Sequence, residues 1–220
     1  MMKRVLEPEV MDDSEQVLAY AQADFEEENQ GFVDQFFTLY PDLENPHIVD
    51  LGCGPGDIAF RVARRHATCR VTGIDASRPM ITYAEQTVQK AGIQDRVQFL
   101  CQRFQEVNLS SPADAIISNS LVHHVPNPLR FWYSLKTLLK PGGPVLVMDL
   151  LRPESPEAAQ AIVEEQAAGE PEQLRKDFYH SLLAAFTEDE VAAQLAELNL
   201  SRLLVDVPDD RHWIVYGRVY

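Results

Sequence analysis

Short apolar runs alternate with amphipathic segments between residues 46 and 152, and this alternation constrains the fold more than any other feature of the sequence. The runs are rich in Val, Ile and Leu, as are parallel strands that are buried on both faces. Strands that alternate with helices form βαβ units, whose crossovers are right-handed. We therefore predict an α/β fold with a doubly wound sheet. The expected strands are residues 47–51, 70–75, 97–101, 113–118 and 145–150.

The segments on either side of this core have different patterns. Apolar residues at helical spacing predict a helical cap over residues 1–45, which Gly31 should interrupt. A second, mostly helical segment is expected as an insertion at residues 153–199. Alternating apolar residues in 200–220 then predict a closing hairpin of antiparallel strands. We expect the whole chain, residues 1–220, to form a single domain.

Charge and cysteine content narrow the class of protein. The 220 residues include 19 Lys and Arg against 34 Asp and Glu, which gives a net charge of -15. A strongly acidic chain is unsuited to nucleic acid, because phosphate binding requires a basic face. No apolar run approaches the roughly 20 residues of a membrane span. The three cysteines are odd in number and lack CxxC spacing, so we expect a reduced, cytoplasmic protein without a metal site.

A glycine-rich turn follows the first expected strand, in the sequence IVDLGCGPGD at residues 48–57. Glycines between a strand and a helix let a ligand approach the backbone closely, because no Cβ is in the way. Gly56 comes one position too early for the dinucleotide fingerprint G-x-G-x-x-G, and the Gly-Lys-Ser/Thr of a phosphate loop is absent. The turn therefore favours a nucleoside-like ligand without a pyrophosphate over a purely structural role.

Asp75 ends the second expected strand, about 20 residues beyond the glycine-rich turn. A carboxylate at this point of a doubly wound sheet can accept hydrogen bonds from both hydroxyls of a ribose. A lone aspartate at a strand end would serve equally well as a helix cap. The position of Asp75 relative to the turn favours the ribose role.

Four segments of the chain form a set: VDLGCGPGD at 49–57, GIDAS at 73–77, DAIISNSLVHHV at 114–125 and LLKPGGPVLVMD at 138–149. In this order they resemble the motifs of the class I S-adenosylmethionine-dependent methyltransferases. The resemblance implies a Rossmann-like sheet of seven strands in the order 3-2-1-4-5-7-6, with strand 7 antiparallel. It also implies that the chain uses S-adenosylmethionine as its cofactor. The paired histidines look like those of enzymes that methylate small molecules, of which quinone-ring methyltransferases are one group.

The same resemblance implies a role for each matching residue around the cofactor. Asp50, the glycine backbone of the turn and Asn119 would border the methionine end. Asp75 would hold the ribose, and Tyr20 on the helical cap would close over the ligand. The residues assigned to the cofactor are Tyr20, Asp50, Gly52, Gly54, Gly56, Asp75, Ala76, Met80, Arg103, Phe104 and Asn119.

The adenine position departs from the family pattern. Arg103 stands where the family often has an acidic residue that accepts from the adenine amino group, and arginine cannot accept a hydrogen bond. Adenine would lie against Ala76 and Met80. A main-chain carbonyl, a glutamine amide or stacking on Phe104 would then replace the missing acceptor.

Fewer residues are recognisable for catalysis. The sulfonium methyl is a strong electrophile, so in-line displacement depends mainly on positioning and on exclusion of water. A base is needed only if the acceptor must lose a proton. His123 and His124 follow the fourth strand, where a neutral imidazole would be a suitable base. We expect the two rings to point in different directions, with His124 towards the substrate, and Asp149 to orient a histidine or bind the acceptor.

Other functions are compatible with part of this pattern. A binding protein could keep the cofactor fold without turnover, and a nicotinamide-dependent oxidoreductase is disfavoured only by the glycine spacing. The acidic charge argues against a nucleic-acid acceptor, and no Asn-Pro-Pro-Tyr-type tetrapeptide follows the fourth strand. We therefore expect a small-molecule acceptor, no nucleic-acid or membrane partner, and a monomer or homodimer.

Overall fold

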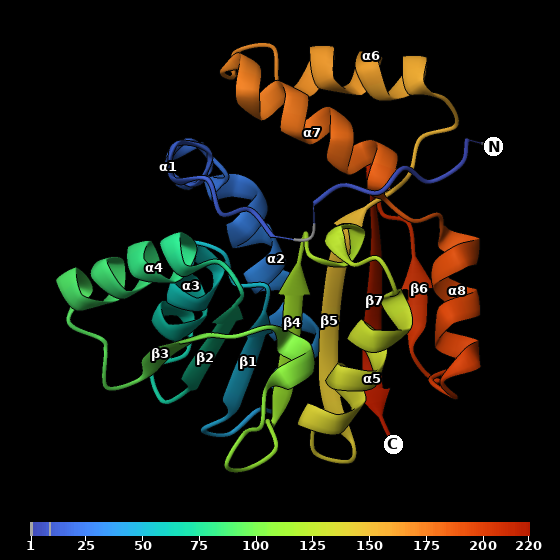
Figure 1. Cartoon of the computed structure of the whole chain (residues 1–220). Coiled ribbons are helices and arrows are strands. Elements are labelled where there is room, and N and C mark those ends of the chain that lie inside the picture. Colours follow the sequence, from blue (N-terminus) through green and yellow to red (C-terminus); the bar gives the residue numbers. More distant parts are fainter. Residues whose placement is uncertain (1, 9) are drawn as a thin grey trace.

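Seven strands form one mixed sheet at the centre of the molecule (Figure 1). The structure, a computed structural model, describes residues 2–8 and 10–220. The strand order is β3-β2-β1-β4-β5-β7-β6, and β7 runs antiparallel to both of its neighbours. This order and the antiparallel strand confirm the predicted fold. The strands are β1 (His47–Leu51), β2 (Arg70–Asp75), β3 (Val97–Cys101), β4 (Ala115–Asn119), β5 (Gly143–Leu150), β6 (Leu204–Asp206) and β7 (His212–Val219).

The start of β4 lies later in the chain than expected. Ala113 makes only an isolated bridge to Leu139, and regular pairing with β1 begins at Ala115. Because β1 pairs in parallel with both β2 and β4, the carboxyl ends of these strands meet at one edge of the sheet. The strand order reverses at this point, which is where doubly wound sheets bind their ligands.

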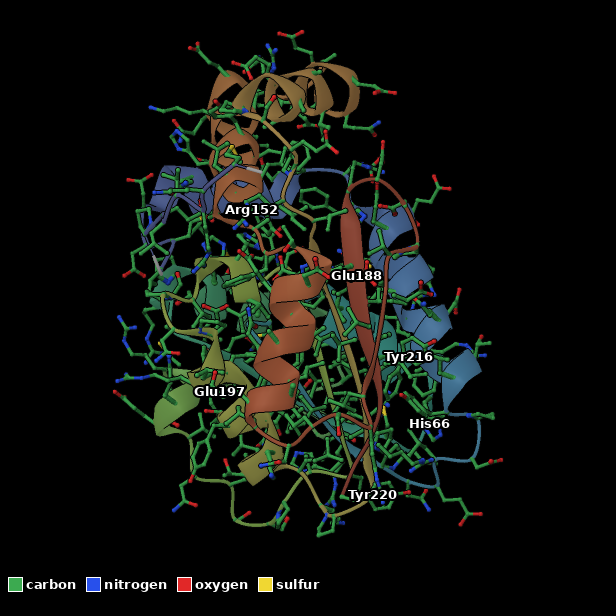
Figure 2. All side chains as sticks on the ribbon, turned by 90° about the vertical axis from the view of Figure 1, so that its right-hand side faces the viewer. His66, Arg152, Glu188, Glu197, Tyr216 and Tyr220 are labelled. Atoms are coloured by element: carbon green, nitrogen blue, oxygen red, sulfur yellow. The ribbon has the colours of Figure 1, made fainter. Side chains whose placement is uncertain are left out.

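Helices cover both faces of the sheet, because successive strand side chains point to opposite faces. Ile48 and Ile117 pack in one apolar cluster with α2 (Glu26–Leu39), α3 (Asp57–Arg65) and α4 (Arg78–Ala91). Val49 and Ile116 pack in another, with α5 (Pro128–Leu138) and α8 (Glu188–Glu197). Figure 2 shows α8, labelled at Glu188 and Glu197, beside the last strands of the sheet. The covering helices are therefore α2, α3 and α4 on one face and α5 and α8 on the other.

The helical cap contains two helices, and the break between them is not at Gly31 as expected. α1 (Ser14–Gln22) ends before residues 23–25, and α2 runs through Gly31. Three glutamates fill the first turn of α2, where negative charge stabilises a helix start. α2 packs on the sheet, whereas α1 lies over the carboxyl edge (Figure 1).

The expected insertion contains α6 (Pro156–Gln166), α7 (Glu172–Ala184) and α8. α6 and α7 form a pair beyond the carboxyl edge of the sheet (Figure 1), held by a small apolar cluster that includes Leu150, Val163 and Leu182. α8 returns to the face of the sheet. Within the described part of the chain, no helix has both the length and the apolar character needed to cross a membrane.

Residues 2–8, which we call the N-terminal strap, cross this edge in an extended conformation between the helix pair and the sheet (Figure 1). The Val5 amide donates a hydrogen bond to the Leu183 carbonyl, 2.9 Å away. The Arg4 guanidinium donates to backbone carbonyls after β4 and at the end of α7, and it stacks 3.9 Å from the centre of the Phe186 ring. The strap thereby joins segments that lie far apart in the sequence.

Candidate active site

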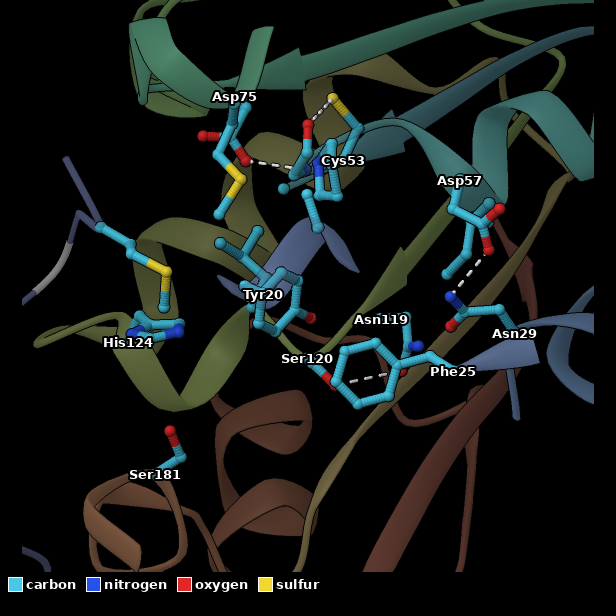
Figure 3. Close-up of a pocket in the computed structure, with 18 of the residues that line it drawn as sticks. Tyr20, Phe25, Asn29, Cys53, Asp57, Asp75, Asn119, Ser120, His124 and Ser181 are labelled. Atoms are coloured by element: carbon cyan, nitrogen blue, oxygen red, sulfur yellow. Dashed lines mark hydrogen bonds between the residues drawn. The ribbon is translucent and has the colours of Figure 1, made fainter. Parts of the chain in front are cut away.

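A cavity of about 650 Å³ opens at the carboxyl edge of the sheet, at the point where the strand order reverses. Its walls come from the turns after β1, β2, β3 and β4 and from α1 and α7, to which Tyr20 and Ser181 belong (Figure 3). Ten of the eleven residues assigned to the cofactor line this cavity; Gly56 does not. The cavity therefore brings together the side chains expected at the cofactor.

The glycine-rich turn is built from three glycines in the left-handed region of backbone space. Their φ angles are 72° at Gly52, 50° at Gly54 and 84° at Gly56. A Cβ at Gly52 or Gly56 would come within 2.8 Å of a neighbouring side chain, whereas a Cβ at Gly54 would meet no atom within 4 Å. Gly54 thus presents bare backbone to the cavity. Gly56 instead starts α3 and allows it to pack closely against β3 and α4.

Asp75 holds this turn in place. Its Oδ2 atom accepts a hydrogen bond from the Gly54 amide at 2.9 Å, and its Oδ1 atom accepts one from the Ser77 amide at 2.8 Å. Burial raises the pKa of Asp75, and these amide hydrogen bonds oppose the rise. The carboxylate lines the cavity beside Gly54, where it has further lone pairs for ribose hydroxyls.

Asp50 is the most deeply buried acid on the cavity wall. Its side chain is 1% exposed, and its Oδ2 atom has no hydrogen-bond partner among the described residues. Burial, with a smaller contribution from Asp75, raises the pKa of Asp50 to about 7. A buried carboxylate oxygen without a partner is costly, and a positively charged ligand group would compensate it.

The adenine end of the predicted site is formed after β2 and β3. Ala76, Met80 and Arg103 line this part of the cavity. Phe104 begins a short 3₁₀ helix, η1 (Phe104–Glu106), and packs edge-on against Phe131 with the ring centres 5.8 Å apart. Because Phe104 is only 8% exposed, little of its ring is open for stacking.

The methionine end of the predicted site lies between β4 and the helical cap. Asn119 ends β4, and its side-chain oxygen accepts a hydrogen bond from the Ser120 hydroxyl (Figure 3). Tyr20 and Phe25 lie opposite, with ring centres 5.2 Å apart. The break between α1 and α2 brings these two rings over the cavity, and sequence patterns did not reveal Phe25 as part of the wall.

Asp149 organises the histidine pair. Its buried carboxylate accepts hydrogen bonds from the Val122 amide and from His123 Nδ1, both at 2.5 Å. It therefore fixes both the start of the 3₁₀ helix η2 (Val122–His124) and the orientation of the His123 ring. This is the orienting role suggested for Asp149; the carboxylate itself does not line the cavity.

The two histidines differ in charge state. Burial opposes protonation of His123, but the Asp149 carboxylate outweighs it and raises the pKa of His123. Burial, followed by repulsion from His123, lowers the pKa of His124 to about 3. For Asp149, burial favours the neutral form, yet His123 holds the pKa of this carboxyl below its ordinary value. His124 is therefore neutral near pH 7, while His123 is the stronger base.

Contrary to expectation, the two rings point to the same place. Their centres are 4.2 Å apart, because the backbone turns in a 3₁₀ helix here instead of continuing in extended form. Both face the carboxylate of Glu7 in the N-terminal strap, whose Oε1 atom lies 3.4 Å from His123 Nε2 and 3.1 Å from His124 Nδ1. The Ser181 hydroxyl of α7 donates to the same carboxylate at 3.2 Å. We name Glu7, His123 and His124 the polar cluster.

The chain belongs to the family whose model is described as a methyltransferase domain, which matches residues 42–198. Together with the strand order and the antiparallel β7, this makes it a class I S-adenosylmethionine-dependent methyltransferase domain.

Curated proteins with similar sequences carry methyltransferase names. A 27-O-demethylrifamycin SV methyltransferase of Amycolatopsis mediterranei is 27% identical over 179 residues, which are 81% of this chain and 62% of that protein. A ubiquinone biosynthesis O-methyltransferase of Coxiella burnetii is 29% identical over 113 residues, 51% of this chain and 45% of that protein. The chain spans less than two thirds of the length of the curated relatives it matches, from 25% to 62%.

Solved structures share the fold. A SAM-dependent methyltransferase from Aquifex aeolicus has a TM-score of 0.67 at 18% identity, over 96% of this chain and 100% of that one. The plantazolicin methyltransferase BpumL, crystallised with a desmethylPZN analogue and SAH, has a TM-score of 0.67 at 14% identity, over 93% of this chain and 91% of that one.

Proposed function

We propose that this chain transfers a methyl group from S-adenosylmethionine to a small organic acceptor by in-line displacement. The observation that carries the proposal is that Gly54, Asp75 and His124 all line one continuous cavity. Its volume of about 650 Å³ is within the range of small-ligand sites, roughly 300–1,000 Å³. The curated relatives support this acceptor class, because their names refer to a rifamycin and to ubiquinone biosynthesis.

The cofactor side of the cavity fits S-adenosylmethionine in three respects. The bare backbone at Gly54 allows close approach, and Asp75 offers a carboxylate for the ribose hydroxyls. The partnerless oxygen of Asp50 is suited to the positive charge of the methionine end. When bound, the cofactor supplies an electrophilic methyl group, and Asn119 lies where the methionine end would be held.

The acceptor side is formed by the polar cluster and the helices above it. His124 is 21% exposed and lines the cavity from η2, so it is placed to orient a polar atom of the acceptor. Where the acceptor must lose a proton, His123 is the base of the pair, because its bond to Asp149 stabilises the protonated ring. Tyr20 and Phe25 close the cavity from the cap and exclude water, which favours displacement at the methyl carbon.

A labelling experiment tests this function directly. The purified chain is incubated with methyl-labelled S-adenosylmethionine and a deproteinised extract of small metabolites, with Gly54→Val as the inactive control. We expect label in a small organic product in the wild-type sample alone. Label in protein or nucleic acid when whole extract is used would overturn the small-molecule assignment. Cofactor binding without any labelled product would favour the non-catalytic alternative.

A further inference from the structure

The polar cluster brings three electron-pair donors to one point between the N-terminal strap and η2. Glu7 Oε1, His123 Nε2 and His124 Nδ1 all lie within 4.8 Å of one another. Glu7 is 10% exposed and His123 3%, so water screens these atoms little. The sequence predicted no metal site, since nothing local connects Glu7 with histidines more than a hundred residues away.

Each ring presents one nitrogen towards Glu7. The Nδ1 atom of His123 is engaged by Asp149, which leaves Nε2 to face Glu7. His124 Nδ1, which faces the same carboxylate, has no hydrogen-bond partner in the described part of the chain. In the neutral form of both rings, which a bound cation favours, each of these nitrogens can offer a lone pair to one ion.

The distances from Glu7 to the two histidine nitrogens are close to those between ligands of one small ion. Atoms bound at about 2.0–2.1 Å to a tetrahedral ion lie roughly 3.4 Å from one another. The two distances to Glu7 Oε1 are 3.4 Å from His123 and 3.1 Å from His124. The shorter one lacks the geometry of a hydrogen bond. Two ligands of one ion have this relationship, because each points at the ion and not at the other ligand.

We propose that Glu7, His123 and His124 bind a first-row divalent transition-metal ion, for which Zn²⁺ is the appropriate probe. Two imidazoles and one carboxylate suit zinc and its neighbours, whereas Mg²⁺ and Ca²⁺ prefer oxygen ligands alone. The outer contacts also match, since metal-binding histidines usually donate their second N–H to a carboxylate or a backbone carbonyl. Asp149 fills this position for His123.

Three protein ligands leave a fourth position on a tetrahedral ion. His123 and His124 both line the cavity, and Ser181 lies across from His124 (Figure 3), so we place this position on the cavity side. An oxygen or nitrogen atom of the methyl acceptor could occupy this fourth position, and this part of the proposal rests on the proposed function. The binding of the ion itself does not depend on it. An ion here would also occupy His123 Nε2, so the role of His123 as a base applies to the ion-free chain. The ion would also tie the strap to η2.

Metal binding is tested with a tag-free chain that has been stripped with a chelator and dialysed. Titration with ZnCl₂ in a calorimeter should give one ion per chain at micromolar affinity or tighter. Co²⁺ should give the visible absorption bands of a four-coordinate site. Glu7→Gln and His124→Ala should each abolish both signals. Glu197→Gln and His180→Ala change exposed residues of the same types and should leave both signals intact.

Binding of S-adenosylhomocysteine, measured without metal, shows that each variant is folded. Zinc binding that survives in Glu7→Gln, or no zinc binding to the wild-type chain, would overturn the metal site. Because metal and cofactor are titrated separately, a failure of either proposal is visible on its own. In a thermal melt, zinc should raise the Tm of the wild-type chain and leave that of Glu7→Gln unchanged.

Discussion

Asp75 accepts a hydrogen bond from the amide of Gly54, 2.9 Å away, although 21 residues separate them in the chain. One carboxylate thus shapes the glycine-rich turn of β1 and stands at the end of β2. We expect Asp75→Ala to weaken binding of S-adenosylmethionine and S-adenosylhomocysteine about 10- to 100-fold, since a hydrogen bond to a charged group contributes about 1.5–3 kcal/mol. Calorimetric titration measures the change.

Asp114→Ala is the matched control for this substitution. Asp114 likewise accepts a backbone hydrogen bond, from His47 at 2.8 Å, but it lies at the opposite edge of the sheet. The Asp114→Ala variant should be less stable than the wild-type chain but bind the cofactor with the same affinity. Equal affinities in the wild-type chain and in Asp75→Ala would remove Asp75 from the binding site.

Gly54→Val should abolish cofactor binding while the circular dichroism spectrum stays close to native. The branched side chain would occupy the open space beside the turn, which is where the ligand is expected to approach. Gly92→Val is the control, because Gly92 also has a positive φ, 69°, and free space around its Cβ position. Both variants should lose about 1–2 kcal/mol of stability from the left-handed backbone. If Gly54→Val binds the cofactor as tightly as Gly92→Val does, the turn is structural only.

Asp50 makes stability depend on pH. The pKa of Asp50 is about 7 in the folded protein and lies above the ordinary value of 3.8. Between these two pH values the folded protein therefore holds a proton that the unfolded chain has released. The stabilisation associated with that proton is complete below the lower value and is lost as pH rises towards 7. Asp50→Asn should remove this decline and unfold at higher denaturant concentration at pH 8. Because the isoelectric point is near 4.7, denaturation is best measured from pH 5.5 upwards.

Cofactor binding should show the opposite dependence on pH through the same residue. A cationic ligand group favours ionised Asp50, so affinity should rise with pH up to about 7 and then level off. Titrations in buffers of different ionisation enthalpy would show proton release below this pH. In Asp50→Asn the contribution of Asp50 to the pH dependence of cofactor binding should disappear. A pH profile of binding identical to that of the wild-type chain would contradict the placement of Asp50 beside the cationic group.

His124→Ala should lower turnover of an identified acceptor roughly 10²-fold, because the acceptor loses a group that positions it, and leave cofactor affinity nearly unchanged. His124 reaches the cavity from η2, whereas the residues assigned to the cofactor lie on other elements. Since the pKa of His124 is about 3, its own titration should leave no inflection between pH 6 and 8. His180→Ala, on the exposed side of α7, serves as control. Full activity of His124→Ala would show that the acceptor needs no help from this ring.

The strands could be predicted because each βαβ unit leaves a local pattern of apolar residues, and their order followed from the resemblance of the motifs to a known family. Two local features were misjudged for physical reasons. Gly31 was expected to end a helix, but tertiary packing of α2 outweighs the weak helix propensity of a single glycine. Ala113 has the apolar character of a strand residue, yet it makes only an isolated bridge to Leu139.

The residues assigned to the cofactor could be placed at one edge of the sheet, because they match the family's motifs and stand at or shortly after strand ends. The polar cluster could not be predicted. Glu7 lies in an acidic stretch in which no pattern distinguishes it from its neighbours, and only the docking of the strap brings it to His123 and His124. The convergence of the two rings likewise depends on the 3₁₀ turn of η2, which the sequence does not mark.

The contacts of Arg4 have a consequence for the order in which the site assembles during synthesis. Arg4 binds the carbonyls of His123, Val125 and Ala184, so the strap, although translated earlier, cannot dock fully before α7 has emerged from the ribosome. The turns that bear Gly54, Asp75 and Asn119 are translated well before that moment. A growing chain would therefore contain the turns assigned to the cofactor while Glu7 is still undocked, and the polar cluster would assemble later.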